Sequence, residues 1–358
     1  MAPERNVFSI TEDSPGENFS AGLLTVEGLP GFGPPTSRGK VRDIWVVEHP
    51  KYGWVRVMIT TDRTSAYDRL ICTVLGKGQV LNKLSEFWFK KTADIVPNHL
   101  LAVPHPNVMI AREAEAMLPV EVVLRRYLAK SSTSTSVYHN YVDGGRRRIY
   151  GIDFPDGLRA NQEFPMGTIL TPTTKAESGH DLELTTEQAQ EIVDPKLGEG
   201  TWEKTKTAAL AVFERAYAYH KKHGLILVDT KYEFGIDAGG QIMLIDEIHT
   251  PDSSRFWLAA SYEERVKKGE NPENFDKEIL RRWLADQGFK GEGRVPEVDP
   301  TVIQKMSEVY QEPYRMVTGQ LLPARDTDSL LYEPNFISAR IKESLVALQS
   351  YGKDIATS

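Results

Sequence analysis

The sequence contains little cysteine, no long apolar run and no excess of positive charge, and each absence excludes a class of protein. The single cysteine, Cys72, excludes an internal disulfide framework and suits a reducing compartment. No stretch approaches the roughly 18 to 20 apolar residues of a membrane-spanning helix. A formal net charge of −7 argues against general nucleic-acid binding. The opening residues have neither an apolar signal core nor an Arg-rich, acid-poor transit pattern, so we expect a cytoplasmic protein.

The composition is that of a folded protein with two or three lobes: 358 residues, 40% hydrophobic and 26% charged. Cys72 lies in an apolar, strand-like run, which favours core packing over a reactive thiol. The three arginines at residues 146–148 favour a solvated turn over an RNA-binding patch, because no further basic cluster accompanies them. Neither GxxxxGK[ST] nor GxGxxG is present, so the P-loop and Rossmann folds have no support.

The stretch at residues 224–257 organises the chain. Two apolar runs, residues 225–228 and 242–245, each end in acidic residues, and glycines at residues 235–240 supply a turn, so the pattern predicts a β-hairpin.

The first of these runs leads into Asp229, Lys231 and Glu233. Their spacing of two places all three side chains on one face of an extended strand. Pairing of the two strands would bring Glu233 or Asp229 close to Asp246, an arrangement that can hold Mg²⁺ with a nucleotide phosphate. For any single acid the alternative is a position on a solvated strand face.

A second candidate site is the loop GKVRD at residues 39–43. Lys40 and Arg42 stand at alternate positions where backbone amides could approach a triphosphate. The alternative for this loop alone is a solvated turn between strands.

Residues 61–68, TDRTSAYD, form a turn-rich stretch from which Asp62, Arg63 and Asp68 are expected to reach a cleft. The alternative is that Asp62 caps the turn. From Leu81 onward the apolar spacing predicts a buried helical stripe, with Lys83 at the start of that helix, where a phosphate could be held.

Further elements follow from local patterns. Residues 119–128 are rich in β-branched side chains and predict a strand. Thr185 to Gln188 has the character of a capping box, and a helix is expected over residues 201–223, ended by Gly224. Helical patterns also occupy the C-terminal part of the chain.

Several segments together resemble one known family. The segments DTKYEFG, LIDEIHTPDSSRFW, GKVRD, TDRTSAYD and TPTTKAE are similar to motifs of the SAICAR synthetases (phosphoribosylaminoimidazole-succinocarboxamide synthases), in the family's order over residues 39–284. The resemblance implies an α+β fold with a small β-rich nucleotide lobe, an ATP-grasp-like lobe and C-terminal helices. We expect these parts at residues 1–118, 119–265 and 266–358.

The resemblance also implies the chemistry. The enzyme would be an ATP-dependent carboxylate-amine ligase that joins L-aspartate to carboxyaminoimidazole ribonucleotide (CAIR) through an acyl phosphate, with ATP as co-substrate and Mg²⁺ as cofactor. No nucleic acid or membrane is expected as a partner, and the chain would be a monomer or a small homo-oligomer.

The resemblance assigns site residues one by one. Lys231, Asp229 and Arg255 are the expected catalytic residues, and Glu233 and Asp246 the metal ligands. The ATP-binding set is Gly39, Lys40, Arg42, Lys83 and Glu121, and the ribonucleotide-binding set is Arg125, Ser131, Asp229, Asp252 and Arg255.

The sequence departs from the family pattern at Lys130, where a Gly usually precedes Ser131. Either the loop geometry differs or Lys130 supplies charge to the same pocket.

Two other functions remain open. A kinase-like phosphotransferase would release ADP without aspartate, although the chain has no HRD and DFG pair. A non-catalytic nucleotide-binding scaffold would bind ATP without turnover.

Overall fold

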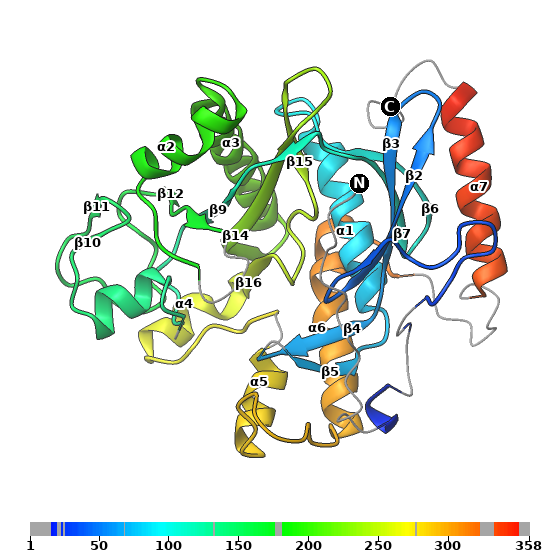
Figure 1. The fold of residues 1–358 in the computed structure, drawn as a ribbon. Coiled ribbons are helices and arrows are strands. Elements are labelled where there is room, and N and C mark those ends of the chain that lie inside the picture. Colours follow the sequence, from blue (N-terminus) through cyan, green and yellow to red (C-terminus); the bar gives the residue numbers. More distant parts are fainter. Residues whose placement is uncertain are drawn as a thin grey trace. The chain divides into compact units, whose positions relative to one another are not determined.

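The computed structural model describes residues 16–19, 23, 26–67, 69–131, 133–175, 181–275, 278–322 and 333–350 (Figure 1). The chain divides into two compact units. Unit 1 comprises Met1–Lys90, Leu100–Glu113 and Asp276–Ser358, and unit 2 comprises Lys91–His99 and Ala114–Phe275. The three-part division expected from the sequence stays a prediction.

Unit 1 is built on an antiparallel sheet with the order β1-β2-β3-β7-β6. A separate pair, β4-β5, and a short 3₁₀ helix, η1 (Gly16–Phe19), accompany it. The strands are β1 (Ser37–Arg38), β2 (Arg42–His49), β3 (Gly53–Thr60), β4 (Arg63–Ala66), β5 (Arg69–Thr73), β6 (Leu100–His105) and β7 (Val108–Arg112).

Helix α1 (Lys77–Thr92) buries Leu81, Leu84 and Trp88, which confirms the apolar stripe. The helix begins at Lys77, earlier than expected. Gly78 in its first turn permits a close approach of the backbone, since a Cβ there would lie 2.4 Å from the carbonyl oxygen of Thr60. The expectation that Lys83 stands at the helix N-terminus is therefore wrong. Lys83 lies within the helix and forms an ion pair with Glu86.

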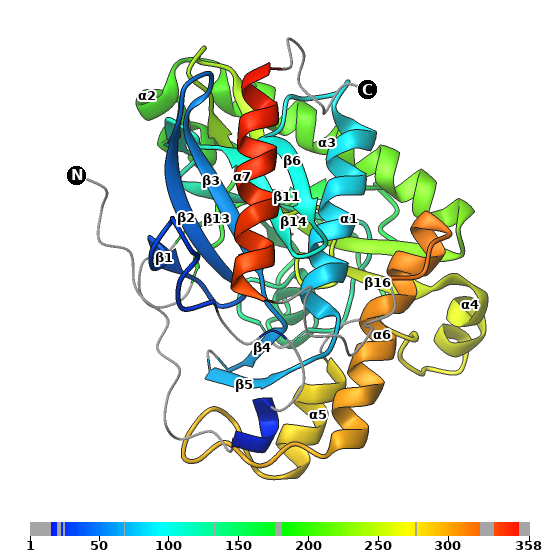
Figure 2. The ribbon, with the colours of Figure 1, turned by 90° about the vertical axis from the view of Figure 1, so that its right-hand side faces the viewer.

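The C-terminal helices of unit 1 are α5 (Glu278–Asp286), α6 (Pro300–Thr318) and α7 (Pro334–Ser350), as the sequence predicts. Helix α7 lies along the sheet (Figure 2). Its residues Ile337, Ile341 and Leu348 share an apolar cluster with Trp45 of β2 and Val57 of β3, all nearly inaccessible to solvent. Because these side chains complete the core, α7 is an integral part of unit 1.

Unit 2 is built on a second antiparallel sheet, with the order β12-β9-β14-β15; β13 also pairs with β9, and β8 and β16 pair with β14. The strands are β8 (Ala116–Met117), β9 (Val120–Arg125), β12 (Ile169–Leu170), β13 (Thr173–Thr174), β14 (Leu225–Ile236), β15 (Ile242–Ile245) and β16 (Ser254–Leu258). Unit 2 also contains a small hairpin, β10 (Arg148–Ile149) and β11 (Ile152–Asp153), and a π-helix, η2 (His139–Asp143).

Three helices belong to unit 2: α2 (Thr186–Leu197), α3 (Thr201–Lys222) and α4 (Ala259–Lys267). The predicted capping box is confirmed, since the Thr185 hydroxyl accepts from the Gln188 amide and the Gln188 side chain accepts from the Thr185 amide. Helix α3 packs against β14 and ends before Gly224, which has φ +79°.

The predicted hairpin is confirmed as β14 and β15, with Glu233 opposite Ile245 and Ile236 opposite Ile242. Its turn is shorter than expected, because Gly235 belongs to β14. A Cβ at residue 235 would lie 2.7 Å from Cβ of Ala114, so the glycine permits a close approach within the sheet.

Asp62 and Arg63 do not reach a cleft, and that expectation is wrong: both are fully buried. The Asp62 carboxylate accepts hydrogen bonds of 2.8 Å from the amide of Leu23 and from the amide of Gly78 in the first turn of α1, so these bonds go to other segments and not to the turn of residues 61–68. Asp68 and His180 lie outside the described residues.

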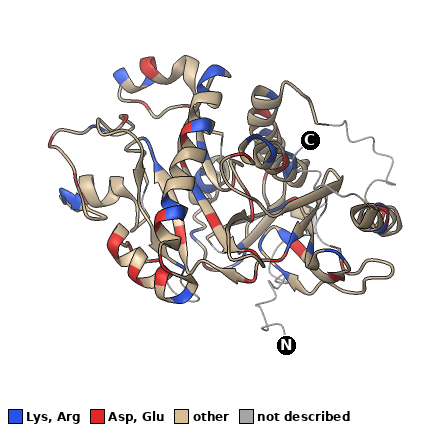
Figure 3. Cartoon of the chain, turned by 90° about the horizontal axis from the view of Figure 1, so that it is seen from above, with Lys and Arg blue, Asp and Glu red and all other residues tan. Residues whose placement is uncertain are grey.

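Two smaller expectations are confirmed. Cys72 is fully buried in β5, and burial raises the pKa of its thiol to about 12, so it is a core residue. The three arginines at residues 146–148 each form an ion pair, with Glu183, Asp156 and Asp153 respectively. Cationic and acidic residues are mixed along the ribbon (Figure 3). Among the described residues, no helix has the length and apolar content needed to cross a bilayer.

Candidate functional site

Strand β14 separates its side chains into two classes. Thr230, Tyr232 and Phe234 are buried in unit 2, with 2% exposure or less. Asp229, Lys231 and Glu233 alternate with them and remain partly accessible. The period of two in a strand therefore turns the three charged side chains to the opposite face, as the sequence predicts.

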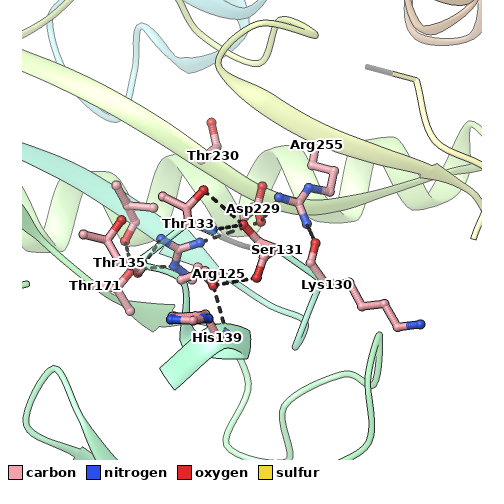
Figure 4. A network of polar contacts seen from close by, with 12 residues as sticks. Arg125, Lys130, Ser131, Thr133, Thr135, His139, Thr171, Asp229, Thr230 and Arg255 are labelled. Atoms are coloured by element: carbon pink, nitrogen blue, oxygen red, sulfur yellow. Dashed lines mark hydrogen bonds and ion pairs between the residues drawn. The ribbon is translucent and has the colours of Figure 1, made fainter. Parts of the chain in front are cut away.

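Asp229 lies in a row of three charged residues that crosses the sheet. In the pairing register, Asp229 of β14 stands opposite Arg125 of β9 and opposite Arg255 of β16. Its carboxylate oxygen Oδ2 lies 4.0 Å from Nη1 of Arg125 and 3.8 Å from Nη2 of Arg255 (Figure 4). Two guanidinium groups therefore share one carboxylate, and the row carries a net positive charge that suits an anionic ligand.

The Arg125 side chain is held in place by its neighbours. Its Nε donates to Oγ1 of Thr171 at 2.9 Å, and its Nη2 donates to the carbonyl of Thr135 at 3.4 Å (Figure 4). Only 15% of the side chain is exposed. The guanidinium is thus oriented before any ligand arrives, which reduces the entropy lost on binding.

Ser131 and Lys130 lie beside this row. The Ser131 hydroxyl donates to Oγ1 of Thr133, and the carbonyl of Lys130 accepts from Nη1 of Arg255 at 3.3 Å. The Lys130 side chain points away from Arg125 and Asp229 (Figure 4). Its backbone is not in the left-handed region. A residue with a side chain is therefore accommodated at this position without backbone strain, and the contact that Lys130 makes with the row comes from its carbonyl.

Further along β14, Lys231 and Glu233 belong to a chain of four alternating charges. Nζ of Lys231 lies 2.8 Å from Glu121 and 3.4 Å from Glu233, and Nζ of Lys175 lies 2.6 Å from the other oxygen of Glu233. Burial alone would lower the pKa of Lys231, but Glu233 and Glu121, with Asp246, raise it well above its ordinary value. Lys231 is therefore a permanent cation near neutral pH.

Glu121, which the resemblance assigns to the ATP-binding set, forms an ion pair with Lys231. Lys175 stands in the TPTTKAE segment, which the family resemblance predicts to be a substrate-facing loop, but Lys175 itself received no role from the sequence. The sequence signal for Lys175 itself was a lysine in a loop segment with no acidic residue three or four positions away.

Asp246 follows β15 with φ +65°, at the start of a turn that also carries Asp252. The amide of Asp252 donates to Oγ1 of Thr250, and that hydroxyl donates to the carboxylate of Glu247. Among the residues described, no group of three or more His, Cys, Asp or Glu side chains is arranged to hold a metal ion. Glu233 and Asp246 alone are still donors of the type that Mg²⁺ takes together with phosphate oxygens.

The second predicted site, the loop of residues 39–42, lies in unit 1. It connects β1 to β2, and the Gly39 amide donates to the carbonyl of Arg42 at 2.8 Å. Lys40 is exposed on the turn and Arg42 is the first residue of β2; the phosphate-binding role of the two cations stays a prediction.

Comparison with known proteins shows the family of the chain. The family model of SAICAR synthetase matches residues 35–298. A phosphoribosylaminoimidazole-succinocarboxamide synthase of Legionella pneumophila (strain Lens) is 46% identical over 83% of this chain and 91% of its own length. The chloroplastic enzyme of Arabidopsis thaliana is 41% identical over 91% of this chain and 75% of its own.

Solved structures agree with the sequence relatives. The SAICAR synthase of Saccharomyces cerevisiae, complexed with SAICAR, is 33% identical with a TM-score of 0.69, covering 84% of this chain and 99% of that one. A SAICAR synthetase in complex with ADP is 25% identical with a TM-score of 0.58, covering 80% and 98%. Since one family model spans most of the chain, and relatives that are 41% and 46% identical cover 91% and 83% of it, the chain belongs to the SAICAR synthetase family.

Proposed function

We propose that this chain is an ATP-dependent ligase that joins L-aspartate to CAIR, giving SAICAR, ADP and phosphate. Family membership supports the reaction, and the observation that carries it in this chain is the shared face of β14. On that face Asp229 lies between two arginines, and Lys231 and Glu233 follow at spacing two. An anionic ribonucleotide and a phosphoryl group can thus be bound along one strand.

The chemical problem is that a carboxylate is a poor electrophile. Transfer of the γ-phosphoryl group of ATP to a carboxylate oxygen of CAIR gives an acyl phosphate and ADP. The aspartate amine then attacks the carbonyl carbon, the bond to the phosphate oxygen breaks, and the amine nitrogen loses a proton. The protein contributes positioning and charge, and no covalent nucleophile is required.

Each charged residue has a role suited to its surroundings. Arg125 and Arg255, with Asp229, Ser131 and Asp252, would bind the ribonucleotide. Lys231 would stabilise the charge of the transferring phosphoryl group, because its raised pKa keeps it protonated and excludes it as a general base.

ATP would be held by Gly39, Lys40 and Arg42, with Lys83 and Glu121 completing the set. Glu233 and Asp246 would hold Mg²⁺, whose charge offsets that of the phosphate oxygens. Both oxygens of Glu233 face lysines, and each oxygen keeps a second lone pair that could coordinate the metal.

The cytoplasmic location and a monomer or small homo-oligomer, both expected from the sequence, are part of this proposal. Size-exclusion chromatography with light scattering measures the second directly.

The test is ADP release by purified protein with Mg-ATP and CAIR, with and without L-aspartate, while SAICAR is followed by chromatography. We expect SAICAR only when all three substrates are present. ADP release without SAICAR would indicate a phosphotransferase, and ATP binding without turnover would indicate a scaffold; either outcome overturns the proposal.

A further inference from the structure

A buried ion pair lies directly under the loop of residues 39–42. Arg63 of β4 and Asp43 of β2 have no exposed side-chain surface, and Nη2 of Arg63 lies 2.8 Å from Oδ1 of Asp43. A buried arginine needs acceptors for several N–H groups, since each unpaired one is costly in a dry interior. Two further acceptors of Arg63 are carbonyl groups of the loop.

The carbonyl groups of the loop are all engaged within unit 1. Nη2 of Arg63 donates to the carbonyl oxygen of Gly39 at 3.0 Å, and Nε of Arg63 donates to the carbonyl oxygen of Lys40 at 3.3 Å. The carbonyl of Val41 accepts from both the amide and the hydroxyl of Thr61, at 2.9 and 2.6 Å. The carbonyl of Arg42 accepts from the amide of Gly39.

This arrangement determines which backbone groups the loop can present to a ligand. Carbonyl oxygens would repel a phosphate, and here every one of the four is directed to a donor of the protein. A backbone with its carbonyls held inward, and with cations at Lys40 and Arg42, is suited to an anion.

Arg63 is itself fixed at its backbone. Its carbonyl accepts from Nζ of Lys77, a buried residue at the start of α1, at 3.1 Å. Its amide donates to Oγ1 of Thr61 at 3.4 Å. The loop is therefore connected through Arg63 to the first turn of α1.

We propose that Arg63, with Asp43 and Thr61, is a positioning group that sets the backbone of residues 39–42 for the phosphates of ATP. The proposal rests on the proposed function, which places the ATP phosphates at Lys40 and Arg42. Arg63 and Thr61 do not act on the nucleotide directly: they fix the conformation that binds it. The remaining possibility is that both residues serve stability alone.

Two substitutions separate these roles. Arg63→Lys keeps a cation beside Asp43 but loses the fork that reaches two carbonyls, and Thr61→Val removes one hydroxyl with almost no change in shape. We expect the KM for ATP to rise about tenfold in R63K and about threefold in T61V. The KM for CAIR and for aspartate should stay within about twofold of wild type.

Arg56→Lys is the matched control. Arg56 also forms a two-pronged ion pair, with Glu113, in the same unit and without contact to the loop. Its substitution should leave the KM for ATP unchanged. If R63K is unfolded at the assay temperature, T61V decides alone, since it loses only the two hydrogen bonds of one hydroxyl, to the carbonyl of Val41 and from the amide of Arg63.

Lys40→Ala distinguishes failure of this inference from failure of the proposed function. A raised KM for ATP in K40A together with unchanged values in T61V and R63K would overturn the positioning role only. An unchanged KM for ATP in K40A would overturn the phosphate loop itself, and this inference with it. A drop in Tm without a selective rise in the KM for ATP would also reject the positioning role.

Discussion

The phenolic oxygen of Tyr232 lies 3.0 Å from Nε2 of His249, and both side chains are completely buried. Tyr232 stands in β14 between Lys231 and Glu233, on the opposite face of the strand. His249 and Asp246 both have positive φ, +51° and +65°, which is uncommon for residues other than glycine. A buried hydrogen bond thus ties the strand to the strained turn that carries Asp246.

Replacing Tyr232 by Phe should lower the free energy of unfolding by about 1 kcal/mol, because one buried hydrogen bond is lost. It should also raise the Mg²⁺ concentration that gives half-maximal activity, because Asp246 is less firmly placed. The control is Tyr141→Phe, which loses a part-buried hydrogen bond to the carbonyl of Pro155 and one from the amide of Leu158 in the same unit. A Mg²⁺ response that is equal in both variants would contradict this role of the bond.

Two buried histidines predict a pH dependence of stability. Burial lowers the pKa of His220 to about 3, and burial and the neighbouring His220 lower the pKa of His249 well below its ordinary value. The unfolded chain binds protons at both as the pH falls below about 6.5, and the folded chain does not. Their contribution to the free energy of unfolding is fully present above about pH 6.5. Below that pH it falls by about 1.4 kcal/mol per pH unit for each histidine.

Urea unfolding of wild type and His220→Asn between pH 7.5 and 5 measures this effect. The variant should lose stability less steeply with falling pH than wild type. Equal slopes would show that His220 is not held neutral.

Lys231→Met and Asp246→Asn should each lower turnover about a hundredfold or more, because the first removes a cation that stabilises the phosphoryl group and the second weakens the proposed Mg²⁺ site. Tm should change little, since the Lys231 side chain is 37% exposed and its removal opens no cavity in the core. Steady-state kinetics and a melting curve test both statements. Lys268→Met, which removes an exposed lysine of a helical ion pair, is the control, and near-normal turnover in K231M would reject its role.

Lys130→Ala should change the KM for CAIR by less than about twofold, because Lys130 contacts the charged row through its carbonyl. Arg125→Ala should raise the same KM by about tenfold or more, since it removes an oriented guanidinium. Kinetics with varied CAIR compare the two. A strong effect of K130A would instead support the second reading of the sequence, in which Lys130 supplies charge.

Ile341→Ala should destabilise the protein by about 2–5 kcal/mol, because Ile341 of α7 is completely buried in the unit 1 core. Val346→Ala on the same helix is the control, since Val346 is 62% exposed. Chemical unfolding measures both. Equal stability of the two variants would mean that α7 does not complete the core.

The predictions that succeeded from sequence depend on local patterns. The capping box at Thr185, the end of α3 before Gly224 and the alternation along β14 are each set by residues within a few positions. Such signals can be recognised in the sequence because capping hydrogen bonds and strand periodicity involve residues close together along the chain.

The predictions that failed depend on distant segments. Arg63 follows an apolar strand and resembles a surface cation, but the chain supplies Asp43 and the loop carbonyls that allow its burial. The row of Arg125, Asp229 and Arg255 also depends on strand register, which places Asp229 beside one residue 104 positions earlier and another 26 positions later. The family motifs name these three residues, but only the register shows that they lie side by side.

The place of α7 in the core has a consequence for synthesis of the chain. Nearly all of unit 2 is contiguous and has left the ribosome well before α7 is made, whereas the sheet of unit 1 is translated early and its covering helix late. Domains tend to fold as units during translation. Unit 2 is therefore free to fold first. The sheet of unit 1 keeps an apolar face exposed until Ile337, Ile341 and Leu348 have been translated and have left the ribosome. A chain stopped before residue 334 would retain the residues of β14 but would leave that face open to aggregation.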